Sequence, residues 1–323
     1  MARITLDDVA REAGVSRMTV SNTYGYPERV APATRERVLH AASTLGYGGP
    51  SAVGRTLRRG STGVLGLLLN EALPYAFTDP GTSSFMRGLA EEAAAQELSL
   101  QIVQAVGDRA RTRVMDSAVD AFVALALEED DPGLAAVLDR RIPLVTLGSP
   151  ALPGVPHLGV DNLAGARAAA EHAVGLGYER FVVLVWELGA GVARERLQGY
   201  RAALPVEPEV LRCRGNTRAE GRATAARLLD TMGDRRTAVL AATDVLALGV
   251  LAAARDRGVS VPDRLGVVGF DDVEEAATSG PSLTTVHQDL AEQGRECVLR
   301  LAGLLATPTA PAPHHLVARE STS

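Results

Sequence analysis

The chain has 323 residues, of which 46% are apolar, and its formal net charge is −6. This composition indicates a folded protein of two or three domains and excludes a largely disordered chain. The charge is uneven, because residues 1–60 hold nine arginines against five acidic residues, a net charge of +4, which leaves −10 for the remainder. A basic head on an acidic body suggests a head that binds a polyanion.

The cysteines, the N-terminal stretch and the longest apolar run indicate the class of protein and its compartment. Two cysteines, Cys213 and Cys297, form no metal or disulfide framework and are expected as small buried apolar residues. The start, MARITLDD, lacks the apolar core of a signal peptide. The apolar run AVLAATDVLALGVLAAA carries Asp244 and predicts a strand followed by a helix rather than a membrane span. We therefore expect a cytoplasmic protein with no cofactor, no metal site and no membrane partner.

Residues 5–23, TLDDVAREAGVSRMTVSNT, predict two short helices joined by a sharp turn. Thr5 and Asp8 have the spacing of a capping box, Gly14 permits the turn, and Ser16 is a good cap for the second helix. This is a helix-turn-helix pattern. The residues expected inside are Val9, Ala10, Val15 and Val20, and those expected outside are Arg17, Met18, Ser21 and Asn22.

A third helix is predicted over Pro32 to Leu45, with proline in its first turn and Gly46 as its stop. The Gly- and Arg-rich stretch that follows, GYGGPSAVGRTLRRGSTG, predicts a linker with a short helix over 51–58. From Thr62 onward, apolar runs such as GVLGLLLN, RFVVLVW and LGVVGF alternate with Ala-rich amphipathic segments. This alternation predicts parallel sheets covered on both faces, in two lobes, with a ligand cleft at the carboxyl ends of the strands.

Taken in order, several stretches resemble the LacI–GalR family of bacterial transcription regulators. They include ITLDDVAREAGVSRMTVS, RTLRRGSTGVLGL, VDNLAGARAAAEHAVGLGY, ARERLQGYRAAL and LGVVGFDD. The resemblance covers essentially the whole chain and implies an N-terminal all-α helix-turn-helix domain plus an α/β two-lobed periplasmic-binding-protein-like effector domain. The expected boundaries are 1–50 for the head, 51–60 for the hinge and 61–323 for the effector and dimerisation domain. Within the effector domain, the first lobe is expected at about 61–161 plus 289–318 and the second lobe at about 162–288.

The resemblance implies that a homodimer binds a pseudo-palindromic double-stranded operator, with the second head helix in the major groove. Arg17, Met18 and Asn22 match family positions that read base edges. Arg suits guanine and Asn suits adenine, although Arg17 alternatively contacts only phosphate. Leu57 matches the hinge leucine that wedges into the minor groove. The expected DNA-contacting residues are Thr5, Ser16, Arg17, Met18, Thr19, Ser21, Asn22, Arg29, Arg55 and Leu57.

For the effector, Arg196 in ARERLQGY and Asp271 in GFDD match family positions that bind the small molecule. A guanidinium and a carboxylate can hold vicinal hydroxyls by charge-assisted hydrogen bonds, and a structural ion pair is the alternative. Gly148 replaces an Asp frequent in sugar binders, and the residues at 216 and 243 also depart from the family, which argues against a simple hexose. The aromatic candidates for flat apolar walls are Tyr75, Phe77 and Trp186. The expected effector-binding residues are Tyr75, Phe77, Trp186, Arg196, Asn216, Thr243 and Asp271.

The sequence thus predicts a sequence-specific transcription regulator, a repressor, whose operator affinity is controlled by a sugar or sugar derivative in the interlobe cleft. One alternative is a doubly wound α/β enzyme acting on a sugar or nucleoside. The chain has no Walker loop, GxGxxG fingerprint, GxSxG elbow or paired-His motif, and no catalytic residue is assigned. A transport binding protein is disfavoured by the basic head, and a regulator that answers to a protein partner remains open.

Overall fold

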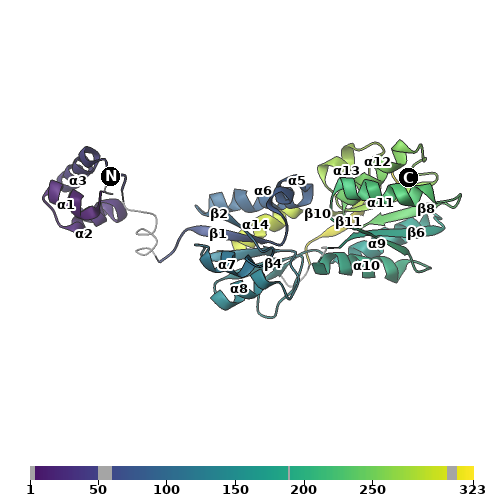
Figure 1. Ribbon diagram of the computed structural model, residues 1–323, viewed down its shortest axis with the longest axis horizontal. Helices are drawn as coiled ribbons and strands as arrows, with labels where there is room; N and C mark the ends of the chain where they lie inside the picture. Colours follow the sequence, from purple (N-terminus) through teal and green to yellow (C-terminus); the bar gives the residue numbers. More distant parts are fainter. Residues whose placement is uncertain (1–3, 50–59, 188–189, 304–310) are drawn as a thin grey trace. The chain divides into compact units, whose positions relative to one another are not determined.

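The computed structural model describes residues 4–49, 60–187, 190–303 and 311–323, and it divides into two compact units, Met1–Thr62 and Gly63–Ser323. The first unit is helical, and the second holds two sheets flanked by helices (Figure 1). The helical elements described in the first unit are α1 (Leu6–Ala13), α2 (Arg17–Gly25), the 3₁₀ turn η1 (Pro27–Arg29) and α3 (Pro32–Leu45).

Helices α1 and α3 begin and end where the sequence predicts, whereas α2 continues to Gly25, two residues beyond the predicted stretch. The Thr5 hydroxyl accepts a hydrogen bond from the Asp8 N–H, and the Asp8 carboxylate accepts one from the Thr5 N–H at 3.0 Å, which confirms the capping box. Gly14 has a φ of 62°, the left-handed conformation that favours glycine, and Ser16 caps α2. Val9, Val20 and Val38 are fully buried in the small core that these helices share.

The first lobe of the second unit is a parallel sheet in the order β2-β1-β3-β4-β5. The central strand β1 is buried along almost its whole length, as expected for a continuous apolar run covered by helices on both faces. The strands are β1 (Val64–Leu69), β2 (Ser99–Gln104), β3 (Ala121–Leu125), β4 (Leu144–Leu147) and β5 (His157–Leu158). The helices are α5 (Leu73–Thr78), α6 (Pro80–Ala95), α7 (Ala110–Asp116) and α8 (Pro132–Arg140).

The second lobe is a sheet in the order β11-β10-β9-β8-β6-β7, parallel except for β11. Helices pack on both of its faces, one core holding Leu246 and Val267 and the other Tyr200 and Phe270. The strands are β6 (Arg180–Trp186), β7 (Glu209–Cys213), β8 (Thr237–Ala241), β9 (Leu265–Asp271), β10 (Thr284–Gln288) and β11 (His314–Val317). The helices are α9 (Asn162–Gly175), α10 (Ala190–Ala203), α11 (Arg218–Asp230), α12 (Asp244–Asp256) and α13 (Glu274–Thr278).

The segment 289–318, expected in the first lobe, is divided between the two lobes. Helix α14 (Leu290–Leu301) packs closely on α6 of the first lobe. Gly88 and Gly294 allow this close approach, because a Cβ on either residue would collide with the backbone of the other helix. Strand β11 instead pairs antiparallel with β10. The placement of β11 in the first lobe is therefore wrong, because the pairing partner of a four-residue strand is not encoded in its own hydropathy.

Candidate functional site

A cavity of about 140 Å³ lies within the second unit, where the carboxyl ends of both sheets meet. Leu69, Leu125 and Leu147 end strands of the first sheet, and all three line the cavity. Strands of the second sheet end at Trp186, Asp271 and Gln288, which line it from the other lobe. This is the position that the alternation of strands and helices predicts for a ligand site in parallel α/β sheets.

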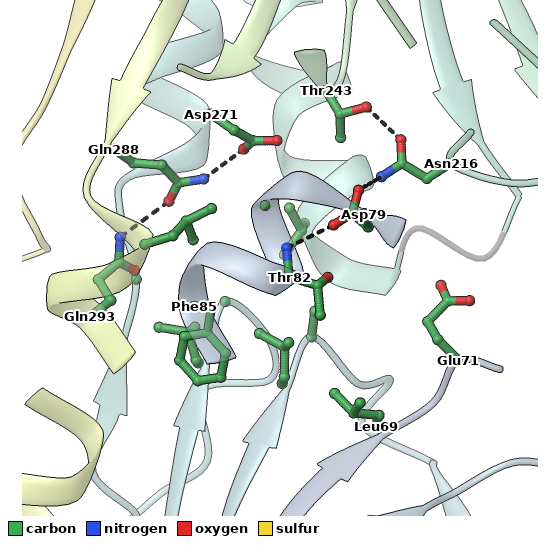
Figure 2. Close-up of a pocket in the computed structure, with 18 of the residues that line it drawn as sticks. Leu69, Glu71, Asp79, Thr82, Phe85, Asn216, Thr243, Asp271, Gln288 and Gln293 are labelled. Atoms are coloured by element: carbon green, nitrogen blue, oxygen red, sulfur yellow. Dashed lines mark hydrogen bonds between the residues drawn. The ribbon is translucent and has the colours of Figure 1, made fainter. Parts of the chain in front are cut away.

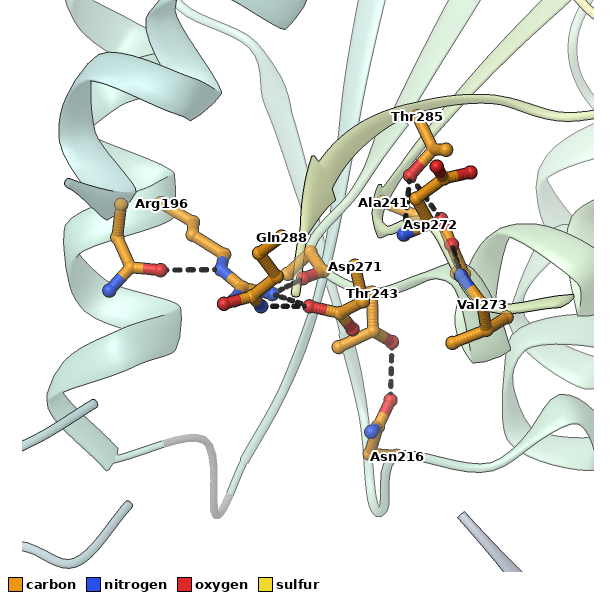
Figure 3. Close-up of polar contacts among 12 residues, drawn as sticks. Arg196, Asn216, Ala241, Thr243, Asp271, Asp272, Val273, Thr285 and Gln288 are labelled. Carbon is orange, nitrogen blue, oxygen red and sulfur yellow. Dashed lines mark hydrogen bonds and ion pairs between the residues drawn. The ribbon is translucent and has the colours of Figure 1, made fainter. Parts of the chain in front are cut away.

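An ion pair between Arg196 and Asp271 forms the polar centre of this cavity (Figure 3). Arg196 Nη1 lies 3.2 Å from Asp271 Oδ1, and the two side chains are 5% and 12% exposed. The guanidinium also donates to the Asn162 side-chain oxygen at 2.9 Å and to the Ala242 carbonyl at 2.6 Å, and it stacks on the Phe270 ring at 3.6 Å. The expected pair is thus in direct contact and held rigidly, rather than separated by space for a ligand.

Two side-chain amides link the Asp271 carboxylate of the second lobe to the first lobe by hydrogen bonds. Gln288 donates to Asp271 Oδ1 at 2.7 Å, and Gln293 on α14 donates in turn to Gln288 at 3.3 Å (Figure 2). Burial raises the pKa of Asp271 to about 6, although Arg196 and Gln288 both favour its charged form. The carboxylate therefore connects β9 and β10 of the second lobe to a helix of the first.

A second set of polar contacts connects the two lobes at Asn216, which follows β7 and lines the cavity. Asn216 donates to the Tyr75 hydroxyl at 2.7 Å and approaches Asp79 Oδ1 at 3.4 Å, both in the first lobe. The Thr243 hydroxyl donates to the Asn216 oxygen, so all three groups orient the amide (Figure 2). Burial and the nearby Asp79 charge raise the pKa of the Tyr75 phenol, which keeps it neutral.

Two further carboxyl groups line the cavity near its Tyr75 side. Asp79 caps α6 by accepting a hydrogen bond from the Thr82 N–H at 2.8 Å, and it is 7% exposed. Burial is the main cause that raises its pKa. Glu71 follows β1, and burial together with the Asp79 charge raises its pKa to about 7. Both carboxyls therefore stand in an environment that opposes their ionisation.

The carboxylate of Asp244 lies next to this site but belongs to the core of the second lobe. It accepts hydrogen bonds from the Val273 N–H at 2.9 Å and the Thr285 hydroxyl at 2.6 Å. Its side chain is fully buried and does not line the cavity. We assign it a structural role in holding α12 against β9 and β10.

Six of the seven expected effector residues line the cavity: Tyr75, Trp186, Arg196, Asn216, Thr243 and Asp271. Phe77 does not, because it projects to the other side of α5 and is 66% exposed. Its neighbour four residues earlier, Leu73, is 39% exposed, as helical spacing requires for residues on one face. The expectation that Phe77 forms an apolar wall of the cavity is therefore wrong.

Sequence reasoning missed Glu71, Asp79, Asn162, Gln288 and Gln293, all of which line the cavity. Gln288 ends β10 and Glu71 lies two residues after the end of β1, so their position at a sheet edge was the available signal. Gln293 sits inside α14 and had no such signal.

Other expectations of the sequence concern metals, thiols and membrane spans. Cys213 and Cys297 are buried and unpaired, as expected. Over the residues that the structure describes, no group of three or more His, Cys, Asp or Glu side chains could hold a metal ion. Across those same ranges, no helix combines the length and apolarity needed to cross a bilayer.

In the helical unit, the start of α2 presents an exposed surface. Met18 is 69% exposed, which is unusual for a large apolar residue and leaves it free to contact a partner. Arg17 pairs with Asp7 at 3.7 Å, with side chains 68% and 58% exposed. An exposed pair of this kind contributes under about 1 kcal/mol, so the guanidinium is easily released to another anion.

The remaining residues expected to contact DNA include helix caps, other residues on or near α2, and residues that the structure does not describe. Thr5 and Ser16 cap helices, and Ser16 and Thr19 hydroxyls lie 2.9 Å apart. Ser21 and Asn22 are half-buried on α2, and Arg29 lies over the Tyr26 ring at 4.5 Å. Arg55, Leu57 and the predicted helix over 51–58 lie outside the described residues.

Two family models match the chain. Residues 5–49 match the bacterial regulatory proteins of the lacI family, and residues 170–322 match a periplasmic binding protein-like domain. The chain is 35% identical to an HTH-type transcriptional regulator of Mycobacterium tuberculosis over 90% of this chain and 88% of the relative. It is 31% identical to the ribose operon repressor of Escherichia coli over 94% of both chains.

Solved structures give the same result over nearly the whole length. The transcriptional regulator CelR in complex with cellobiose is similar with a TM-score of 0.70 and 30% identity, over 99% of this chain and 100% of that one. The lac repressor dimer, bound to operator and the anti-inducer ONPF, is similar with a TM-score of 0.79 and 25% identity, over 99% of both chains.

Proposed function

The chain belongs to the LacI family of bacterial transcription regulators, and on this premise we propose that a small polyhydroxylated effector in the cavity controls its affinity for operator DNA. The observation that carries the proposal is the buried pair of Arg196 and Asp271 at the carboxyl ends of the strands. The contacts described for this pair use Nε and Nη1 of Arg196 and Oδ1 of Asp271. Nη2 and Oδ2 remain to bind adjacent hydroxyls, one as donor and one as acceptor.

The two walls of the cavity also suit a carbohydrate-like ligand. The first lobe contributes apolar side chains, among them Leu69, Phe85 and Leu125, and both lobes contribute polar groups. A sugar ring has hydroxyl groups and apolar C–H faces, which matches this mixed lining. Two similar proteins support the class: one is solved with cellobiose, and another is named a ribose operon repressor.

A ligand that contacts both lobes favours one interlobe arrangement and shifts DNA affinity through its differential affinity for the two states. The hydrogen bond between Tyr75 and Asn216 shows that residues lining the cavity already connect the lobes. Polar side chains of both lobes line a cavity at the ends of the strands, which favours a small-molecule effector over a protein partner. The named relatives are transcription regulators, which lends no support to the enzyme alternative.

The single tryptophan of the chain lines the cavity and reports directly on its occupancy. We expect one or more compounds from a panel of neutral sugars, amino sugars and polyols to change Trp186 fluorescence and to raise the melting temperature. A ligand at about 100 times its Kd stabilises the native state by about 2.7 kcal/mol. If no compound of the panel changes either signal, a carbohydrate-like effector is excluded.

For the DNA side, we propose that a homodimer binds a pseudo-palindromic operator and that Arg17 and Met18 read base edges in each half-site. Arg17→Ala should cost about 1–3 kcal/mol at one base pair per half-site, because a bidentate contact with guanine is lost. Binding-site selection from random duplexes by both proteins measures this. Arg11→Ala is the matched control, since Arg11 is also well exposed and paired with an acid but lies on α1. A uniform loss of affinity with an unchanged base preference would reduce Arg17 to a phosphate contact.

A further inference from the structure

We infer that the effector is a cation, a single hydroxylated ring that carries a protonated amine. The inference rests on the proposed function, because it specifies the ligand of the same cavity. It follows from the charges that line the cavity, from the groups that already neutralise them and from the available volume.

The cavity carries more acidic groups than basic ones. Three carboxyl groups line it, those of Glu71, Asp79 and Asp271, whereas Arg196 is the one basic side chain in the described lining. Arg196 and Asp271 neutralise each other through their direct contact. Two acidic groups are therefore left without a counter-charge in the described wall of the cavity.

The bonding of Arg196 leaves little of its charge for an anionic ligand. Its guanidinium is already bound to Asn162, the Ala242 carbonyl and Asp271, and one face is covered by the Phe270 ring. A phosphate or carboxylate on the ligand would have to compete with Asp271 while lying near two further acids. A ligand anion would add to the causes that already oppose the ionisation of Glu71 and Asp79. This arrangement disfavours sugar phosphates and sugar acids.

The carboxyl groups of Glu71 and Asp79 can instead bind a cation. Both residues belong to the first lobe and line the cavity. Glu71 follows β1, and Asp79 caps α6, which begins one residue later. Across the described residues, no hydrogen bond reaches the Glu71 carboxylate, and its backbone oxygen alone is bound, by Gln104. Figure 2 shows both side chains at the end of the cavity nearest Asn216. An ammonium group placed there has three donors for carboxylate oxygens.

The electrostatic state of these two groups agrees with this assignment. Burial raises the pKa of Glu71 to about 7, and the causes identified for Glu71 and Asp79 include no nearby cation. A bound ammonium would supply the missing charge and favour the ionised form of both carboxyls. The ligand thus replaces a counter-ion that the protein itself does not provide.

The size of the cavity favours a ligand of one ring. Its volume is about 140 Å³, which suits one sugar ring better than two. A disaccharide such as the cellobiose bound to CelR would need the lobes to open further. One ring with an amine and several hydroxyls uses Glu71 and Asp79 at one end and the pair of Arg196 and Asp271 at the other.

The test compares matched pairs of compounds with the full-length protein. Glucosamine, galactosamine and mannosamine are titrated beside glucose, galactose and mannose near pH 6.5, where the amines are protonated. Glucose 6-phosphate and cellobiose complete the set. Trp186 fluorescence and calorimetry give the affinities. We expect at least one amino sugar to bind about tenfold or more tightly than its neutral counterpart, because an ammonium–carboxylate bond is charge-assisted. We expect no binding of the phosphate.

Glu71→Gln should lower the ratio of amino-sugar affinity to neutral-sugar affinity toward one, because the amide cannot supply a negative charge. Glu275→Gln is the matched control, because Glu275 influences Asp79 electrostatically but does not line the cavity. It should retain the preference. Equal or tighter binding of a neutral sugar or of the phosphate would overturn the inference and leave the proposed function standing. Failure of every compound to bind would overturn both.

Discussion

Replacing Asp271 by Ala should lower the free energy of unfolding of the two-lobed unit by about 3–5 kcal/mol. The reason is that Arg196, 4% exposed, would keep its charge in a buried site after losing its only acidic partner among the described contacts. Chemical denaturation followed by Trp186 fluorescence measures the change. Operator binding of the variant, assayed below its unfolding transition, should be retained, because the substitution lies outside the helical unit.

Two control variants test this explanation for Asp271. Asp139→Ala removes the acid of an exposed pair, Arg111 with Asp139 at 2.7 Å, which is shorter than the buried pair. It should cost under about 1 kcal/mol, because water screens exposed charges. Adding Arg196→Met to Asp271→Ala should recover a large part of the loss, since no unpaired charge then remains. Equal costs for the two single variants would show that burial of the pair is unimportant.

Removing residues 1–62 should abolish detectable retardation of an operator fragment, because the basic charge and the exposed start of α2 lie in that unit. The full chain should bind with a steep salt dependence. A dimer that neutralises about six phosphates loses about 10³-fold in affinity between roughly 50 and 200 mM salt. A truncated protein that melts cooperatively but retards the operator as well as the full chain would place the DNA contact elsewhere.

Elements with strong local signals could be predicted from the sequence. The capping box at Thr5, the turn at Gly14 and the proline-to-glycine limits of α3 each depend on residues close in sequence. Continuous apolar runs such as β1 and β6 likewise identify buried parallel strands without tertiary information. The convergence of strand ends on one cavity followed from the alternation of strands and helices.

Features that depend on tertiary neighbours could not be predicted in this way. The six-residue helix α5 is too short to show periodicity, so the outward direction of Phe77 was missed. The pairing of β11 is set by the distant strand β10. Gln293 enters the cavity through the packing of α14 on the first lobe, and Asp79 through the position of the start of α6.

The central claim is that a ligand in this cavity changes the affinity of the protein for its operator. The most direct test is a fluorescence-anisotropy titration of a selected operator with the full-length protein, with and without a saturating compound that changes Trp186 fluorescence. Coupling between two sites of one protein commonly reaches about 5–150-fold in affinity. We predict that the compound shifts the operator-binding midpoint by a factor within this range. If the compound is an amino sugar, the Glu71→Gln variant should show no shift at a concentration that saturates only the unmodified protein. A compound that fills the cavity, as Trp186 reports, but leaves the midpoint unchanged would contradict the account.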